Sequence, residues 1–351
     1  MLNCRAIPLA SAGEISPLFG LLTLVLVGVV LVSLVLQRFR QSLLVGYFLC
    51  GVLLANSGLL DWVGADSGDL DRLADLGVIL LLFTLGLEFS FKEIKHLRRV
   101  ALLGGGLQVG LVGIAAGGAC VLFGFPLPVA IALAVAIALS STAVSIKAFH
   151  DLGMADSPAA RVALGVAIFQ DILVIFFMII LPPLLGQGDG EMAVGIVVAV
   201  LKGVLFLCAC WFLSRHGIPQ ILHAVARTRS RELFTVTVVG LCAAVAFGAV
   251  QLNLSAALGA FAAGLVVSES IYSHRVLADI LPFRDLFLTI FFVSIGLLID
   301  LGEVASSWAL ISSATLMILI IKFGAGFLAA KRLGVGLRPC LLAAGALAST
   351  G

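Results

Sequence analysis

The stretch ALSSTA at residues 138–143 has a weaker copy, ALASTG, at residues 346–351. Each places neighbouring hydroxyl side chains in an otherwise apolar part of the chain. Ser and Thr hydroxyls inside a helix bond back to carbonyls of the preceding turn and bend it. We therefore expect a broken helix at each stretch, although small residues of this kind are also common where membrane helices simply pack closely.

Two further segments recur in the same order along the chain. LVGYFLCG at 44–51 resembles ALGAFAAG at 257–264, and TLGL at 84–87 resembles SIGL at 294–297. The matched residues lie 213, 210 and 208 positions apart in the three pairs, taken in chain order. The shared order and the slowly changing spacing predict an internal duplication.

The composition excludes a soluble protein. Hydrophobic residues make up 62% of the 351 residues, charged residues only 11%, and the mean hydropathy is +1.22. Apolar runs of this length in lipid must be helices, since an open sheet edge would leave backbone groups unpaired. We predict an all-α polytopic membrane protein with twelve runs, at about 17–36, 42–60, 74–91, 100–122, 128–148, 162–185, 193–213, 233–250, 254–270, 285–299, 308–330 and 339–351.

Charged residues between the runs predict the orientation. Of the 21 Lys and Arg residues, 17 follow an odd-numbered run, whereas acidic residues dominate the loops that follow even-numbered runs. By the positive-inside rule, the N-terminus lies on the extracytoplasmic side of the membrane. We expect this membrane to be the plasma (inner) membrane. A net charge of +2 without a basic tract gives no indication of a nucleic-acid partner.

The repeat joins runs two and nine, three and ten, and five and twelve. A shift of seven spans is odd, so the second copy is inverted, which is the architecture of secondary transporters. We expect an extracytoplasmic segment at 1–16, a first repeat of six helices at 17–185, a linker helix at 193–213 and a second repeat at 233–351. A partner for the sixth run is missing, so we expect the sequence to stop before the last helix.

Asp171 lies near the centre of its apolar run. A carboxylate at that depth is costly and usually marks an ion or proton path. It can bind a proton and a monovalent cation in turn, and neighbouring Gln170 can lend a carbonyl oxygen to the cation. The alternative is a packing role, with Asp171 bonded to a neighbouring helix or paired with Lys322.

The other candidate residues surround the predicted breaks. If the helix unwinds at Ser140, Ser141 and Thr142, freed carbonyls and hydroxyls become hard oxygen ligands for alkali cations. Ser349 and Thr350 would form the second break. Lys322 would neutralise Asp171 when no ion is bound, unless it snorkels to water instead. Two other polar residues lie deep in apolar runs. Lys202 stays ambiguous between packing, a dimer contact and a transport role, and Gln108 is interpreted as a helix-packing amide.

No enzyme or cofactor is predicted. GxxxxGK[ST], HExxH and GxSxG motifs do not occur in the sequence, the five His residues lack metal-ligand spacing, and the seven Cys residues are interpreted as small hydrophobes. The ions to be transported are K⁺ or Na⁺ together with H⁺, and the lipid bilayer is the surrounding partner.

Four motifs resemble the monovalent cation:proton antiporters of the Kef type, which include the glutathione-gated potassium efflux systems. They are LSSTA at 139–143, FQDI at 169–172, FFVSIG at 291–296 and IK at 321–322. The resemblance implies discontinuous crossing helices in two inverted repeats, a homodimer, and a core domain that moves against a dimer domain. It also implies cation binding at Asp171, assisted by Gln170 and the Ser141–Thr142 region. Gln rather than Asn before the aspartate favours K⁺.

Two departures from the Kef pattern concern regulation. Those systems carry a His-x-x-Glu-Ser-Asp loop, of which only His274 and Asp279 are matched here, and they end in a cytosolic nucleotide-binding Rossmann domain, expected only beyond residue 351. The leading hypothesis is antiport of K⁺ or Na⁺ against H⁺ by alternating access. A ligand-gated potassium efflux channel and a membrane sensor that transports nothing are the alternatives.

Overall fold

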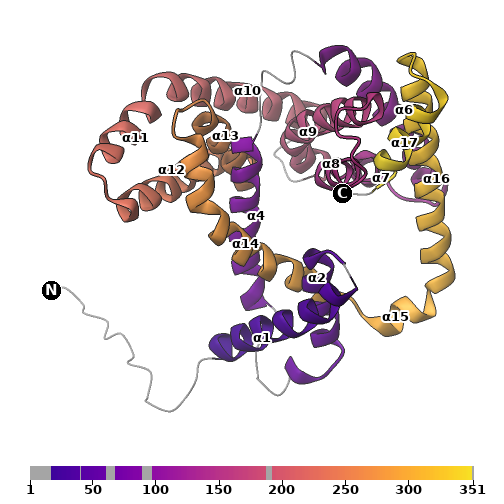
Figure 1. Ribbon diagram of the computed structural model, residues 1–351, viewed down its shortest axis with the longest axis horizontal. Coiled ribbons are helices and arrows are strands. Elements are labelled where there is room, and N and C mark those ends of the chain that lie inside the picture. The colour runs from indigo at the N-terminus through magenta and orange to yellow at the C-terminus, as the bar shows by residue number, and fades with distance from the viewer. Residues whose placement is uncertain (1–16, 40, 61–67, 89–96, 187–191, 350–351) are drawn as a thin grey trace. The chain divides into compact units, whose positions relative to one another are not determined.

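The computed structural model describes residues 17–39, 41–60, 68–88, 97–186 and 192–349, and in these residues every regular element is helical (Figure 1). The predicted all-α fold is therefore confirmed. The helices are α1 Pro17–Arg38, α2 Leu43–Ala55, α4 Gly68–Glu88, the π-helical turn η1 Val100–Gly105, α6 Gly106–Leu122, α7 Leu127–Ala138, α8 Thr142–Asp151, α9 Pro158–Leu184, α10 Met192–His216, α11 Ile218–Arg227, α12 Arg231–Gln251, α13 Ala256–Ser268, α14 Ser273–Leu297, α15 Leu301–Ser306, α16 Trp308–Arg332 and α17 Leu337–Leu347.

Seven helical segments of the described chain are long and apolar enough to cross a membrane. Four shorter apolar helices, α2, α7, α13 and α17, accompany them. Two predicted boundaries were wrong. The run at 285–299 belongs to α14, which already begins at Ser273 and so includes the basic residues that the sequence suggested for a loop. The loop after run seven contains a helix of its own, α11.

The chain forms two compact units, and neither corresponds to one predicted repeat. One comprises the chain up to Thr84 together with Leu277–Ser307, and the other comprises Leu85–Val276 together with the chain from Trp308 onward. Each unit therefore combines helices of both predicted copies. The repeat boundaries themselves stay a prediction.

A glycine crossing joins α2 to α14 in the first unit. A Cβ atom on Gly296 would lie 2.9 Å from the Cα atom of Gly51 and would overlap the carbonyl oxygen of Phe48. Real Cβ atoms do not approach backbone so closely, so only glycine permits this packing. Leu21, Cys50 and Val293 bury the apolar faces of α1, α2 and α14 beside it.

A matching crossing joins α4 to α13 in the second unit. A Cβ atom on Gly86 would lie 3.0 Å from the Cα atom of Gly264 and would overlap the carbonyl oxygen of Phe261. These three residues are the repeat counterparts of Gly296, Gly51 and Phe48. The two crossings are the same contact made with exchanged partners, as an inverted duplication requires.

The core of the second unit is made largely of small residues. Ala159, Ala163, Ala330, Ala343 and other buried side chains bring α8, α9, α16 and α17 together. A second cluster, which includes Val112, joins α6 and α7 to α16. Small side chains let helix backbones approach closely in lipid, where the hydrophobic effect does not drive helix association. This packing gathers the polar residues described next.

Candidate functional site

The helix predicted to break at Ser140–Thr142 is broken. Helix α7 ends at Ala138, Leu139 is extended with φ −68° and ψ 144°, and α8 begins at Thr142. Ser141 is also extended, and its hydroxyl caps α8 by accepting a hydrogen bond from the backbone N–H of Val144 at 3.3 Å. The break leaves the carbonyls at the end of α7 without partners in their own helix.

Two buried glutamines hold this break in place. Gln170 on α9 and Gln108 on α6 are 1% and 0% exposed. The Gln170 amide nitrogen donates to the Gln108 side-chain oxygen at 2.8 Å and to the Ala138 carbonyl at 3.0 Å, while its oxygen accepts from the Ser140 backbone N–H at 2.9 Å. Gln108 also donates to Ala138, at 3.3 Å. The Gln170 carbonyl oxygen, expected at the cation, is thus already engaged with backbone.

Lys322 is fully buried on α16 and bonds the ends of two helices. Its ammonium donates to the carbonyl of Leu139, after α7, and to the carbonyl of Ser349, after α17, the latter at 2.9 Å. A cation is favourable there because helix C-termini carry partial negative charge. The expected ion pair with Asp171 is absent among the described residues. The two helix-end carbonyl groups accept the hydrogen bonds of the ammonium in place of the Asp171 carboxylate.

Asp171 lies on the exposed side of α9, next to buried Gln170. Consecutive helix residues point about 100° apart, so one faces the core and the other away from it. The Asp171 carboxylate accepts one long hydrogen bond, at 3.4 Å, from the hydroxyl of half-buried Thr142 at the first turn of α8. The carboxylate is therefore close to the break, as expected, and retains free oxygen lone pairs.

The second hydroxyl stretch meets the first. Helix α17 ends at Leu347. The hydroxyl of Ser140 donates to the Leu347 carbonyl at 2.7 Å, and the hydroxyl of Ser145 donates to the Ala346 carbonyl at 3.1 Å. The Ser349 hydroxyl bonds back to Ala346 at 2.8 Å. The end of α17 therefore lies against the α7–α8 break, while Thr350 falls outside the described residues.

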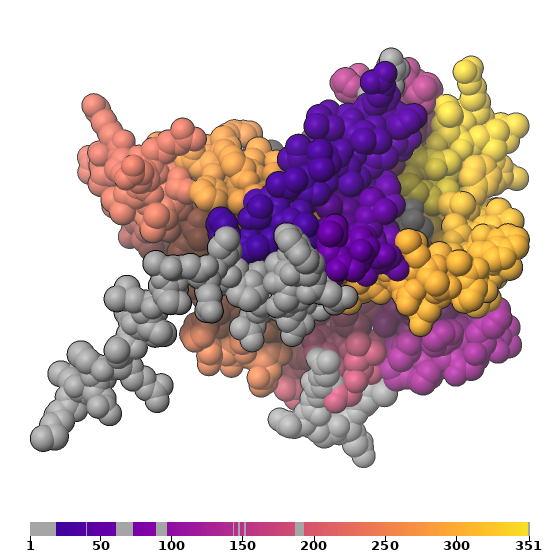
Figure 2. Space-filling view, turned by 90° about the horizontal axis from the view of Figure 1, so that it is seen from below, coloured from indigo at the N-terminus to yellow at the C-terminus, as the bar shows by residue number. Residues whose placement is uncertain are grey.

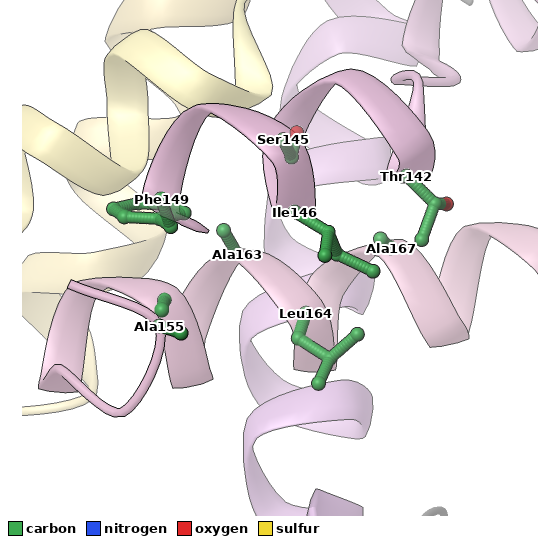
Figure 3. A pocket seen from close by; sticks show the side chains of 9 residues that line it. Thr142, Ser145, Ile146, Phe149, Ala155, Ala163, Leu164 and Ala167 are labelled. Carbon is green, nitrogen blue, oxygen red and sulfur yellow. The ribbon is translucent and has the colours of Figure 1, made fainter. Parts of the chain in front are cut away.

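A pocket of about 110 Å³ opens between α8 and α9 beside this contact. Figure 3 shows two facing stripes at helical spacing, one on each helix, with Ala155 from the connecting loop nearby. The lining residues are Thr142, Ser145, Ile146 and Phe149 on α8, Ala160, Ala163, Leu164 and Ala167 on α9, and Ala155. Because the α9 stripe is mainly alanine, the space has room for several water molecules and ends at the Thr142 hydroxyl.

Sequence reasoning placed most of these residues together but missed some partners. Gln108 joins α6 to α7 and α9, as expected of a helix-packing amide, and is thereby part of the cluster around the break, while Ser145 contacts α17. The contact of Ser145 could have been predicted, because Ser145 is polar and follows the hydroxyl stretch by one helical turn. Lys202, half-buried on α10, makes no hydrogen bond or ion pair with the described residues.

Comparisons with known proteins address the whole arrangement. Residues 21–351 match the family described as sodium/hydrogen exchanger, transmembrane. The chain is 34% identical to the putative cation/proton antiporter YbaL of Escherichia coli K12, covering 94% of this chain and 61% of that protein. It is 32% identical to the glutathione-regulated potassium-efflux system protein KefC of Cronobacter sakazakii, covering 85% and 48%. The chain thus spans about half the length of such curated relatives.

A solved structure supports the fold. The chain resembles the sodium proton antiporter MjNhaP1 of Methanocaldococcus jannaschii with a TM-score of 0.60 at 15% sequence identity, covering 94% of this chain and 84% of that one. At this identity the likeness concerns the fold alone, and it confirms the inverted-repeat architecture expected from the sequence.

Proposed function

Because the chain belongs to the sodium/hydrogen exchanger family, as the Kef-type motifs indicated, we propose that it exchanges a monovalent cation for protons by alternating access. The observation that carries this proposal is the Asp171 carboxylate beside a helix break. It is held by one long hydrogen bond from Thr142, and the negative helix ends nearby are already compensated by Lys322.

In this proposal Asp171 binds either the cation or the proton. The hydroxyl of Thr142 supplies a second oxygen, and the N-terminus of α8 favours negative charge at this point. Ser140, Ser141 and Gln170 act by positioning the backbone. Gln170 and Ser141 hold the break in its extended form, and Ser140 bonds it to the end of α17. The role of Gln170 thus changes from ligand to positioning residue.

The pocket between α8 and α9 gives water a way to the Thr142 hydroxyl. By the charge pattern, the loop that joins these helices is cytoplasmic, so the pocket would hydrate the site from that side. Water at Thr142 can relay a proton or share the coordination of a cation. Alanines on α9 keep this space open.

We propose K⁺ as the cation. KefC is named as a potassium-efflux protein, and the Gln-Asp sequence is shared with the Kef type. Na⁺ is the competitor to be tested in the same assay. We further propose that the protein acts in the plasma (inner) membrane as a homodimer with an extracytoplasmic N-terminus.

The test is ion exchange by the intact protein in liposomes that contain a pH-sensitive dye. Addition of K⁺ should move protons in the wild type, and Asp171→Asn should reduce this movement to the level of protein-free liposomes. Glu269→Gln, a change at an exposed acid at the end of α13, serves as the matched control and should retain exchange. Exchange by Asp171→Asn at the wild-type rate would refute the proposed role.

Competition between the two ions gives a second readout. Because a carboxylate must lose its proton to bind a cation, the K⁺ concentration for half-maximal exchange should rise as the pH falls, by up to about tenfold per pH unit. K⁺ flux that proceeds without proton movement would instead identify a channel. No flux in either assay would identify a sensor.

A further inference from the structure

Helix α11 connects two long apolar helices, α10 and α12 (Figure 1). Helix α10 has 25 residues and is about 37 Å long, which exceeds the roughly 30 Å thickness of the hydrocarbon. The regular α-helix is interrupted at Gly217, and the chain continues as α11 before α12 begins. Ile218 and Leu222 are fully buried and fix α11 to the second unit, where it contacts α10, α12 and α13.

The outer side of this segment is strongly basic. Residues 215–231 contain four Arg and two His residues and no acid. The side chains of Arg215, His223, Arg227 and Arg229 are exposed. Figure 2 shows the salmon-coloured atoms of this segment uncovered at the surface of the molecule. The segment thus buries apolar residues of α11 on its inner side and exposes basic residues on and beside α11.

An exposed tryptophan lies just before the basic segment, at the end of α10. The guanidinium of Arg215 lies 4.6 Å from the ring centroid of Trp211, which is itself exposed. Trp residues gather at the membrane–water interface, where the ring contacts lipid and its polar edge meets headgroups. By this criterion we expect the end of α10, where α11 follows, to lie near the level of the lipid headgroups.

The backbone at Arg229 gives an independent indication. Arg229 has φ 57°, in the left-handed region, where glycine or asparagine is favoured and a side chain such as arginine costs free energy. The other non-glycine residue with positive φ among the described residues is Asn253, at φ 58°, just beyond the opposite end of α12. Asn253 is the expected type and Arg229 is not, so a cationic side chain occupies the turn despite the conformational cost.

We propose that Arg227 and Arg229, at the end of α11 and in the turn to α12, form a binding site for the phosphate of an anionic phospholipid headgroup. The arginine fork matches phosphate oxygens in geometry and keeps its charge at any physiological pH. A basic amphipathic helix next to a membrane span has the charge that complements an anionic leaflet. This site is separate from the proposed ion site and does not depend on it.

The experiment titrates the delipidated, detergent-solubilised protein with phosphatidylglycerol or with phosphatidylcholine and counts bound lipids by native mass spectrometry. The wild type should prefer phosphatidylglycerol by at least about tenfold, and this preference should decline with salt. Arg227→Gln combined with Arg229→Asn should weaken phosphatidylglycerol binding roughly 25-fold, about fivefold for each arginine.

The matched control removes the same charge from another helix end. Lys331→Gln combined with Arg332→Gln, both exposed at the end of α16, should leave phosphatidylglycerol binding unchanged. Arg229→Asn keeps the left-handed turn, so its unfolding temperature should not fall. Equal binding of the two lipids, or equal losses in both double variants, would overturn the proposal. Full displacement of the lipid by millimolar inorganic phosphate would assign the site to free phosphate instead.

Discussion

The two glycine crossings are near copies of each other, whereas the two hydroxyl stretches that meet in the second unit differ in chemistry. Gly86 and Gly296 make equivalent backbone contacts. By contrast, Ala348 stands where the first copy has Ser140, and the carboxylate of Asp171 lies beside the first stretch. The duplication thus preserves the packing of the helices and concentrates the reactive groups at one break.

The largest effect is expected at Lys322, whose ammonium bonds to a carbonyl group beside each of the two hydroxyl stretches. Lys322→Met leaves the carbonyls of Leu139 and Ser349 without their buried donor, at about 1–3 kcal/mol for each. We expect a stability loss of about 4 kcal/mol, measured by thermal unfolding in detergent. Lys331→Met, at the exposed end of the same helix, should cost less than about 0.5 kcal/mol. Equal losses in the two variants would show that Lys322 does not support the breaks.

The next largest effect is expected at the two glycine crossings. Gly86→Val and Gly296→Val each force a side chain into backbone that lies within 3.0 Å or closer, and overpacking of this kind costs about 1–3 kcal/mol or more. If the crossings are equivalent, both variants should lower the unfolding temperature by a similar amount. Gly110→Val, where a Cβ atom meets nothing within 4 Å, is the control. A large difference between the first two would disprove the equivalence.

A smaller effect is expected at the pocket that opens on the first break. Ala163→Leu fills the space between α8 and α9, so water reaches Thr142 less easily. We expect ion exchange to slow about tenfold, which corresponds to about 1.4 kcal/mol in the barrier. Leu in place of exposed Ala148 on α8, which does not line the pocket, should leave exchange unchanged. Unimpaired exchange by Ala163→Leu would remove the pocket from the transport route.

The smallest effect is expected at Thr142 and tests whether its hydroxyl takes part in cation binding or only lies beside the site. Thr142→Val keeps the shape of the side chain and removes the hydroxyl that donates to Asp171, a neutral-donor bond worth about 0.5–1.5 kcal/mol. The K⁺ concentration for half-maximal exchange should rise about threefold, while Thr142→Ser should behave as the wild type. If Val and Ser act alike, the hydroxyl takes no part in binding.

Sequence alone predicted the features that depend on local chemistry and periodicity. The helix break follows from adjacent hydroxyl residues in an apolar run, and the inverted architecture follows from three repeated segments in constant order. Both are visible in the chain without knowledge of distant contacts. The apolar runs also located most of the long helices, but they missed α11, which lies in a predicted loop, and the charged first turns of α14.

The contacts of buried polar residues could not be predicted in the same way. Gln170 and Asp171 are neighbours in sequence, but the helical rotation turns one into the core and leaves the other exposed. Lys322 was expected to seek the nearest opposite charge, yet two backbone carbonyls from distant segments satisfy it. Which of several polar groups meet depends on how four helices pack, and no spacing in the sequence records that.

The ammonium of Lys322 ties segments 183 and 27 residues away from it in the chain. If either interrupted helix shifted by itself, one carbonyl would lose its hydrogen-bond donor, and the lysine would keep only one of these two hydrogen bonds. The cheapest displacement therefore carries both interrupted helices together as a single rigid piece. In the proposed exchange, a partial step that moved one ion without its counterpart would therefore be penalised at the same buried nitrogen.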